Sequence, residues 1–218
     1  MKREHKIEQN YIDYLKSLGC VFYAPLDSTN GLTDLITNTI GTVQYNNTAV
    51  WDNNENAYLF TKSSAYSPKQ GIVIWENLGM DLATTNPNTS LLCKLNISRF
   101  GNSWNGVADD ANTTINCATG DRKLLYSPQL INIQKNVWCD YAQVIDLTNL
   151  VQSRYLDGVL AFQASAGAGS ITSNDKNILY INLCTNNQGY TNAVFYAKEL
   201  MLFNTALDVN TIRQIQGL

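Results

Sequence analysis

Residues 155–160, Tyr155-Leu156-Asp157-Gly158-Val159-Leu160, place an Asp-Gly dipeptide between two short apolar runs. Both central residues of a type I′ turn need a positive φ, and Asp-Gly adopts this conformation readily. The hexapeptide therefore predicts a tight antiparallel hairpin. It is the strongest local structural signal in the chain, and it indicates a fold built from neighbouring antiparallel strands.

The sequence on either side of this hairpin has the same character. Residues 138–144 alternate, which predicts a strand with Trp138, Ala142 and Val144 on its inward face. Other short apolar runs are separated by Asn, Gly, Asp and Pro. The predicted strands are 20–26, 43–50, 57–61, 90–97, 113–118, 129–133, 137–145, 152–156, 159–163, 178–184 and 193–203. So many short strands predict an all-β, two-sheet antiparallel jelly-roll sandwich.

A short helix is expected at each end of the chain. Residues 2–18 have an amphipathic pattern, and Gly19 ends it. The apolar positions on its one face are Ile7, Tyr11, Leu15 and Leu18. Either the sandwich or a partner must cover this stripe, so residues 1–18 are interpreted as a docking or oligomerisation helix and residues 19–218 as the sandwich. Residues 207–215 predict a C-terminal helix with Asp208 as its N-cap.

Composition narrows the classes of partner. The chain has 218 residues, of which 44% are hydrophobic and only 15% charged, with a net charge of -3. No basic stripe is present, which argues against nucleic acid. No segment has the roughly 18 apolar residues of a membrane-spanning helix, and no apolar core of a signal peptide follows the N-terminus. We expect synthesis in the cytoplasm, with incorporation into a virion as one route to the outside.

The cysteines indicate packing rather than metal binding. Cys20, Cys93, Cys117, Cys139 and Cys184 are widely spaced in apolar stretches, and no CxxC pair occurs. Zinc ligation therefore lacks support. Small buried side chains in a reducing compartment are the preferred interpretation.

Four stretches in order along the chain resemble the concanavalin A-like lectin/glucanase superfamily, specifically its laminin-G-like jelly-roll domains. These are residues 21–27 (VFYAPLD), 136–144 (NVWCDYAQV), 154–160 (RYLDGVL) and 195–207 (FYAKELMLFNTAL). The resemblance implies a jelly-roll fold. It leaves activity open, because this superfamily contains glycan-binding modules, adhesion domains, glycoside hydrolases and parts of viral particles.

Catalysis is not expected. Hydrolytic relatives use closely spaced carboxylates, typically Glu-x-Asp-x-Glu on one strand. None of the glutamates has an acidic neighbour two residues away: Glu4, Glu8, Glu55, Glu76 and Glu199. His5 is the single histidine, and it lies in the front of the predicted helix, which disfavours triads and excludes multi-histidine metal sites. A glycosidase-like enzyme is the least favoured interpretation.

Two polar loops carry an aromatic residue among amides, which is the chemistry that binds a neutral sugar. The candidate ligand-binding residues are Trp104, Asn102, Asn105, Asn187 and Tyr190. Core packing or a subunit contact is the competing interpretation of Trp104. No cofactor is expected, except that a Ca²⁺ ion remains possible, since laminin-G-like relatives often bind one near the sandwich edge. Its candidate ligands are Asp27, Asp34, Asp109 and Asp110, whose competing role is to cap turns.

The favoured function is a non-catalytic adhesion or decoration module that binds surface glycans. The alternative is a structural component of a phage particle, such as a head, tail-fibre or decoration protein, without a glycan ligand. A second structural protein, or a second copy bound through the N-terminal helix, would then be the partner. We expect a complete protein with no export signal, and this expectation favours the alternative.

Overall fold

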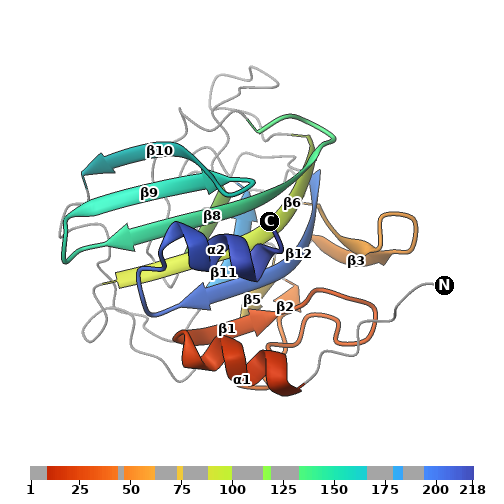
Figure 1. Cartoon of the computed structure of the whole chain (residues 1–218). Helices are drawn as coiled ribbons and strands as arrows, with labels where there is room; N and C mark the ends of the chain where they lie inside the picture. The colour runs from red at the N-terminus through yellow and green to blue at the C-terminus, as the bar shows by residue number, and fades with distance from the viewer. Residues whose placement is uncertain are drawn as a thin grey trace.

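A computed structural model describes residues 9–43, 47–61, 73–75, 88–99, 115–118, 133–165, 179–183 and 194–218. The described strands form two antiparallel sheets, which confirms the predicted all-β sandwich (Figure 1). The large sheet contains, in spatial order, β10 (Val159–Ser165), β9 (Val151–Leu156), β8 (Trp138–Asp146), β6 (Asn88–Arg99), β12 (Val194–Phe203), β4 (Ala57–Thr61) and β3 (Thr48–Asp52). Its remaining strand, β1 (Cys20–Ala24), pairs with the second half of β12.

The small sheet has the order β2 (Thr42–Val43), β5 (Val73–Trp75), β11 (Leu179–Leu183) and β7 (Ile115–Ala118). The prediction of a single strand over 43–50 was wrong, because the chain there contributes β2 to the small sheet and then β3 to the large one. The three-residue strand β5 was not predicted. Of the predicted strand 129–133, only residue 133 is described, and it lies outside any strand.

The hairpin of β9 and β10 has the predicted turn. Val159 pairs with Leu156, so Asp157 and Gly158 alone form the connection. Their φ angles are 49° and 69°, as a type I′ turn requires. Strand β10 lies at the edge of the large sheet, which agrees with the exposed positions along it.

The main core lies between the two sheets. Trp75 of the small sheet is fully buried there, packs edge-on against Phe22 of β1 with 5.2 Å between ring centroids, and donates its indole N–H to the carbonyl of Leu32. Large-sheet residues of this core include Leu95 and Phe195. Trp75 is therefore a core residue.

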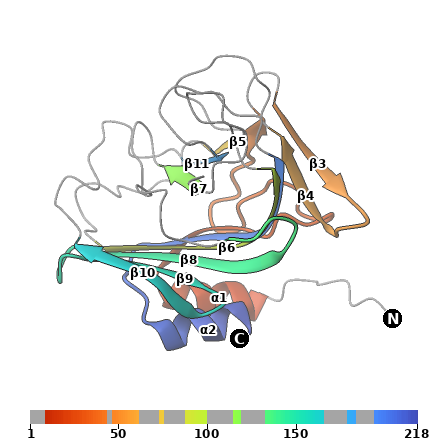
Figure 2. The same ribbon diagram turned by 90° about the horizontal axis from the view of Figure 1, so that it is seen from above.

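A second core lies on the opposite face of the large sheet, called the outer face below. Figure 2 shows three layers, with β5, β7 and β11 on one side of the large sheet and the two helices on the other. Strand β8 is consequently buried on both faces. The expected inward face of β8 was wrong: Ala142 and Val144 face the helices, whereas Cys139, Tyr141 and Ile145 face the small sheet.

Helix α1 (Gln9–Ser17) uses its apolar stripe within the chain. Leu15 is fully buried in the second core, with Tyr11, Tyr14 and Leu18 packed around it. The apolar stripe could be covered by the sandwich or by a partner; over residues 9–18 the sandwich covers it. Ile7 lies outside the described residues. Neither described helix is long and apolar enough to span a membrane.

Helix α2 (Val209–Gln216) begins where the sequence predicts. The carboxylate of Asp208 accepts hydrogen bonds from the backbone N–H groups of Asn210 and Thr211, which confirms the N-cap. The helix is fastened to the large sheet at its other end. Arg213 donates from Nε to the Gly158 carbonyl at 3.0 Å, and Gln216 donates to the Tyr141 carbonyl at 3.1 Å.

The described cysteine side chains agree with the sequence interpretation. Cys20, Cys93 and Cys139 are buried in the two cores. Burial raises the pKa of the Cys139 thiol to about 12, with a further contribution from the charges of Asp157 and Asp140. A thiol with such a pKa remains protonated and unreactive near neutral pH. The described cysteines are therefore packing residues.

Candidate functional site

Three neighbouring strands of the large sheet place an amide between two aromatic rings on the outer face. Asn96 of β6 pairs with Trp138 of β8 on one side and with Tyr196 of β12 on the other. The two ring centroids are 6.4 Å apart, and both side chains are half-buried. We call Trp138, Asn96 and Tyr196 the aromatic row.

A β-bulge in β12 separates this row from the apolar core beneath the helices. Before the bulge Phe195 and Ala197 face the main core, so Tyr196 and Lys198 point to the outer face. The register shifts between Lys198 and Met201, and Glu199 has a φ of 54°. One extra residue reverses the alternation, so that Met201 also faces outward and packs under the helices. The outer face is therefore apolar beneath the helices and polar at the aromatic row.

Asn96 is the least accessible member of the row. Its side chain is only 8% exposed, and among the described residues its Oδ1 atom has no hydrogen-bond partner. A buried acceptor without a partner costs roughly 1–3 kcal/mol. The row therefore has, at its centre, an acceptor that a hydroxyl or N–H donor would satisfy.

The last residue of β3 and the connection from β3 to β4 supply one carboxylate to each ring. Trp138 donates its indole N–H to Glu55 Oε2 at 3.2 Å, and the Tyr196 hydroxyl donates to Asp52 Oδ2 at 3.1 Å. Lys198 lies beside them, with Nζ 4.4 Å from the Trp138 ring centroid and 3.0 Å from the Glu55 carbonyl oxygen. Such a cation–ring contact fixes the orientation of the indole.

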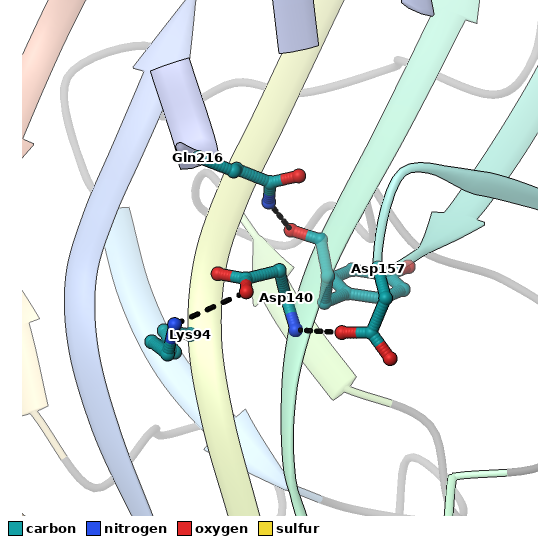
Figure 3. Close-up of polar contacts among 5 residues, drawn as sticks. Lys94, Asp140, Asp157 and Gln216 are labelled. Carbon is teal, nitrogen blue, oxygen red and sulfur yellow. Dashed lines mark hydrogen bonds and ion pairs between the residues drawn. The ribbon is translucent and has the colours of Figure 1, made fainter. Parts of the chain in front are cut away.

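A second charged group borders the row. Lys94 of β6 forms an ion pair with Asp140 of β8, with 3.1 Å between Nζ and Oδ2. Asp157, from the hairpin turn, accepts the backbone N–H of Asp140 at 2.8 Å, and Gln216 of α2 approaches from above (Figure 3). The type I′ turn and the C-terminal helix therefore hold this end of the site in place.

Burial and neighbouring charges change the ionisation of the row. The pKa of Lys198 is lowered, first by burial and then by the Lys94 charge, although Glu55 opposes this effect. The pKa of Tyr196 is raised by burial and by its contact with Asp52. The pKa of Asp52 is lowered, mainly because it accepts the backbone N–H of Asn54. At neutral pH the row therefore has a neutral phenol beside an ionised carboxylate.

This arrangement offers the groups that bind a hydroxyl-rich molecule. The two rings provide apolar surface, the carboxylates and Asn96 accept hydrogen bonds, and the lysines donate them. The Asp140 carboxylate is paired with Lys94, and the Asp157 carboxylate accepts the backbone N–H of Asp140. The geometry consequently favours binding over proton transfer.

The sequence-predicted calcium ligands that are described hold loops together. Asp34 is fully buried and accepts the backbone N–H groups of Tyr23 and Ile36. Asp27 accepts the backbone N–H groups of Thr29 and Asn30. Within the described part of the chain, no group of three or more His, Cys, Asp or Glu side chains could hold a metal. Asp109 and Asp110 lie outside the described residues, so the calcium site stays a prediction.

The predicted sugar-binding residues also lie outside the described residues: Trp104, Asn102, Asn105, Asn187 and Tyr190. Sequence reasoning overlooked the aromatic row, because it treated Trp138 as a core residue. A signal was present. Lys94-x-Asn96, Trp138-x-Asp140 and Tyr196-x-Lys198 each place two polar or aromatic residues on one face of a strand. Only the order of the strands shows that the three pairs are neighbours.

Comparison with known proteins supports the fold. No protein-family model and no curated protein sequence matches this chain significantly. Among solved structures, the receptor-binding domain of botulinum neurotoxin D aligns with a TM-score of 0.58 at 14% identity, over 91% of this chain and 52% of that one. A second solved structure concerns botulinum neurotoxin type C, whose cell entry is described as dependent upon interaction with two ganglioside molecules. It aligns with a TM-score of 0.59 at 13% identity, over 94% of this chain and 52% of that one.

The binding domain of botulinum neurotoxin DC in complex with SialylT aligns with a TM-score of 0.58 at 12% identity, over 91% of this chain and 51% of that one. This chain thus spans about half the length of the solved structures it matches. At such identities the likeness establishes a shared β-sandwich fold alone. The ligands of those domains do not transfer to this chain by similarity.

Proposed function

We propose that this chain is a non-catalytic glycan-binding module and that the aromatic row on the outer face of its large sheet is the binding site. The observation that carries this proposal is Asn96, whose buried Oδ1 lacks a described partner between two half-buried aromatic rings. A sugar presents apolar faces and hydroxyl donors together, and this combination suits rings beside acceptors.

Two further considerations support the proposal. The sequence resembles the concanavalin A-like superfamily in residues 21–27, 136–144, 154–160 and 195–207, and many of its members bind glycans. The structural neighbours include a receptor-binding domain, a binding domain in complex with SialylT, and a neurotoxin whose cell entry depends on ganglioside molecules. We assign the chain to this superfamily as part of the proposal, and to adhesion as its role.

The test compares tryptophans of matched exposure on a glycan array. Trp138 and Trp51 are both half-buried, lie in the large sheet, and each donates an indole hydrogen bond. Trp138→Leu should weaken binding at least tenfold, because the row loses a ring. Trp51→Leu should bind like the wild type, because Trp51 contacts Tyr58 and Asn53 outside the row.

Trp104→Ala, measured with and without Ca²⁺, tests the alternative site predicted from the sequence. Loss of binding in this variant but not in Trp138→Leu would move the site to residues 101–110 and overturn the assignment to the aromatic row. A silent array from a stable wild-type oligomer would overturn glycan binding. It would favour a structural particle component instead.

A further inference from the structure

The charges around the aromatic row are unbalanced. Its two rings and the ion pair beside them are bordered by the carboxylates of Asp52, Glu55, Asp140 and Asp157 and by the ammonium groups of Lys94 and Lys198. Four carboxylates against two ammonium groups leave a surplus of two negative charges among these residues. The potential at the row is therefore negative.

Both ammonium groups are already engaged. Lys94 is paired with Asp140, and Lys198 donates to the Glu55 carbonyl while it lies over the Trp138 ring. An anionic ligand would therefore have to share each ammonium group with the partner that the group already has.

The acceptor of the row that has no described partner also favours an uncharged donor over an anion. Asn96 Oδ1 can only accept a hydrogen bond, and it is flanked by Trp138 and Tyr196. A hydroxyl or amide N–H can donate to it, whereas an ionised carboxylate cannot. The oxygen is buried, so a ligand can contact it only where a neighbouring side chain moves aside.

We propose that the aromatic row selects uncharged, hydroxyl-rich glycan ends and rejects sialylated or otherwise acidic ones. This inference rests on the proposed function and specifies its ligand class. It differs from the ligands of the structural neighbours, since gangliosides and sialylated sugars are acidic. The physical cause is the surplus of carboxylates, which repels a negative ligand and accepts hydroxyl donors.

The experiment measures affinity for matched pairs, each a neutral galactose-terminated oligosaccharide and its sialylated form. Two surplus charges about 7 Å from a ligand carboxylate, at an effective dielectric constant of about 60, correspond to roughly tenfold discrimination. Wild-type protein at low salt should therefore bind the neutral form at least about tenfold more tightly. The ratio should shrink at high salt because the charges are screened.

Charge-removing variants identify the cause. Asp52→Asn together with Glu55→Gln keeps an acceptor oxygen for Tyr196 and Trp138 but removes two negative charges. This variant should bring the affinity ratio close to one. Asp13→Asn removes one charge from an exposed position on α1 and should leave the ratio unchanged.

The possible failures are distinguishable. Sialylated glycans that bind as well as neutral ones, with binding lost in Trp138→Leu, would overturn the selectivity and leave the proposed function standing. An unchanged ratio in the Asp52→Asn, Glu55→Gln variant would show that these carboxylates are not its cause. Absence of binding to either form would overturn the proposed function and this inference together.

Discussion

Replacing Gly158 by alanine tests how the hairpin turn beside the site is fastened to helix α2. Gly158 has a φ of 69°, and an alanine in this conformation costs about 1 kcal/mol. Its Cβ would lie 2.8 Å from Cγ and 3.0 Å from Nε of Arg213, so the arginine side chain must move. The bond from Arg213 Nε to the Gly158 carbonyl, 3.0 Å long, would then be lost.

Loss of that bond adds about 1 kcal/mol, which gives a total of about 2 kcal/mol. For a chain of this size, we expect the melting temperature to fall by about 4–8 °C. Gly217→Ala is the matched control, because Gly217 has a φ of 72° and a Cβ there would meet nothing within 4 Å. It should lower the melting temperature by about half as much.

The assay is thermal unfolding of the two single variants, of Arg213→Ala, and of the Gly158→Ala, Arg213→Ala double variant. The double variant should cost about 1 kcal/mol less than the sum of the singles, because the same hydrogen bond is lost in both. If the losses of unfolding free energy in the two single variants were strictly additive, the proposed steric clash between a Cβ at position 158 and the Arg213 side chain would be refuted. Equal losses in Gly158→Ala and Gly217→Ala would refute the fastening of the turn by Arg213.

Three further results are expected. Asn96→Leu should leave the melting temperature unchanged or slightly raised in thermal unfolding, since an acceptor without a described partner disappears. The same variant should lower the affinity for neutral glycans at least tenfold. A large loss of stability would make Asn96 purely structural. Asp34→Ala should cost about 3 kcal/mol in denaturant unfolding, because the backbone N–H groups of Tyr23 and Ile36 lose their acceptor; a loss below 1 kcal/mol would contradict this. The Cys139 thiol has a pKa of about 12 in the folded protein, against 9.0 ordinarily. The free energy of unfolding therefore keeps the full contribution of the protonated thiol below pH 9 and loses it as the pH rises towards 12. Cys139→Ala should reduce the slope of unfolding free energy against pH by about 1.4 kcal/mol per unit in that window, and an unchanged slope would show that the thiol ionises normally.

Local patterns were enough to predict the fold class and several of its parts. The turn at Asp157 and Gly158 depends on φ preferences of two adjacent residues, and the N-cap at Asp208 depends on one carboxylate and the next backbone N–H groups. These interactions involve residues that are close together in the chain, so they can be predicted from the sequence. The roles of Asp27 and Asp34 as turn caps, weighed as an alternative to calcium binding, are of the same local kind.

Patterns of burial were less informative where two layers cover one sheet. Alternation along β8 gave the wrong inward face, because the helices bury Ala142 and Val144 as thoroughly as the small sheet buries Tyr141. Likewise, the apolar run at 43–50 did not show that the chain passes from one sheet to the other within it. The residues beyond the described ranges, including Trp104 and Tyr190, stay predictions.

The aromatic row is a product of tertiary structure. Asn96, Trp138 and Tyr196 are separated along the chain by 42 and 58 residues, and no local preference brings them together. They become neighbours because β6 lies between β8 and β12, and they share a face because Asn96 lies directly opposite both Trp138 and Tyr196 in the register of the sheet. Composition and turn chemistry specify which elements form, since those depend on short-range forces. Strand order and register, which depend on burying both faces of the large sheet at once, decide which side chains meet.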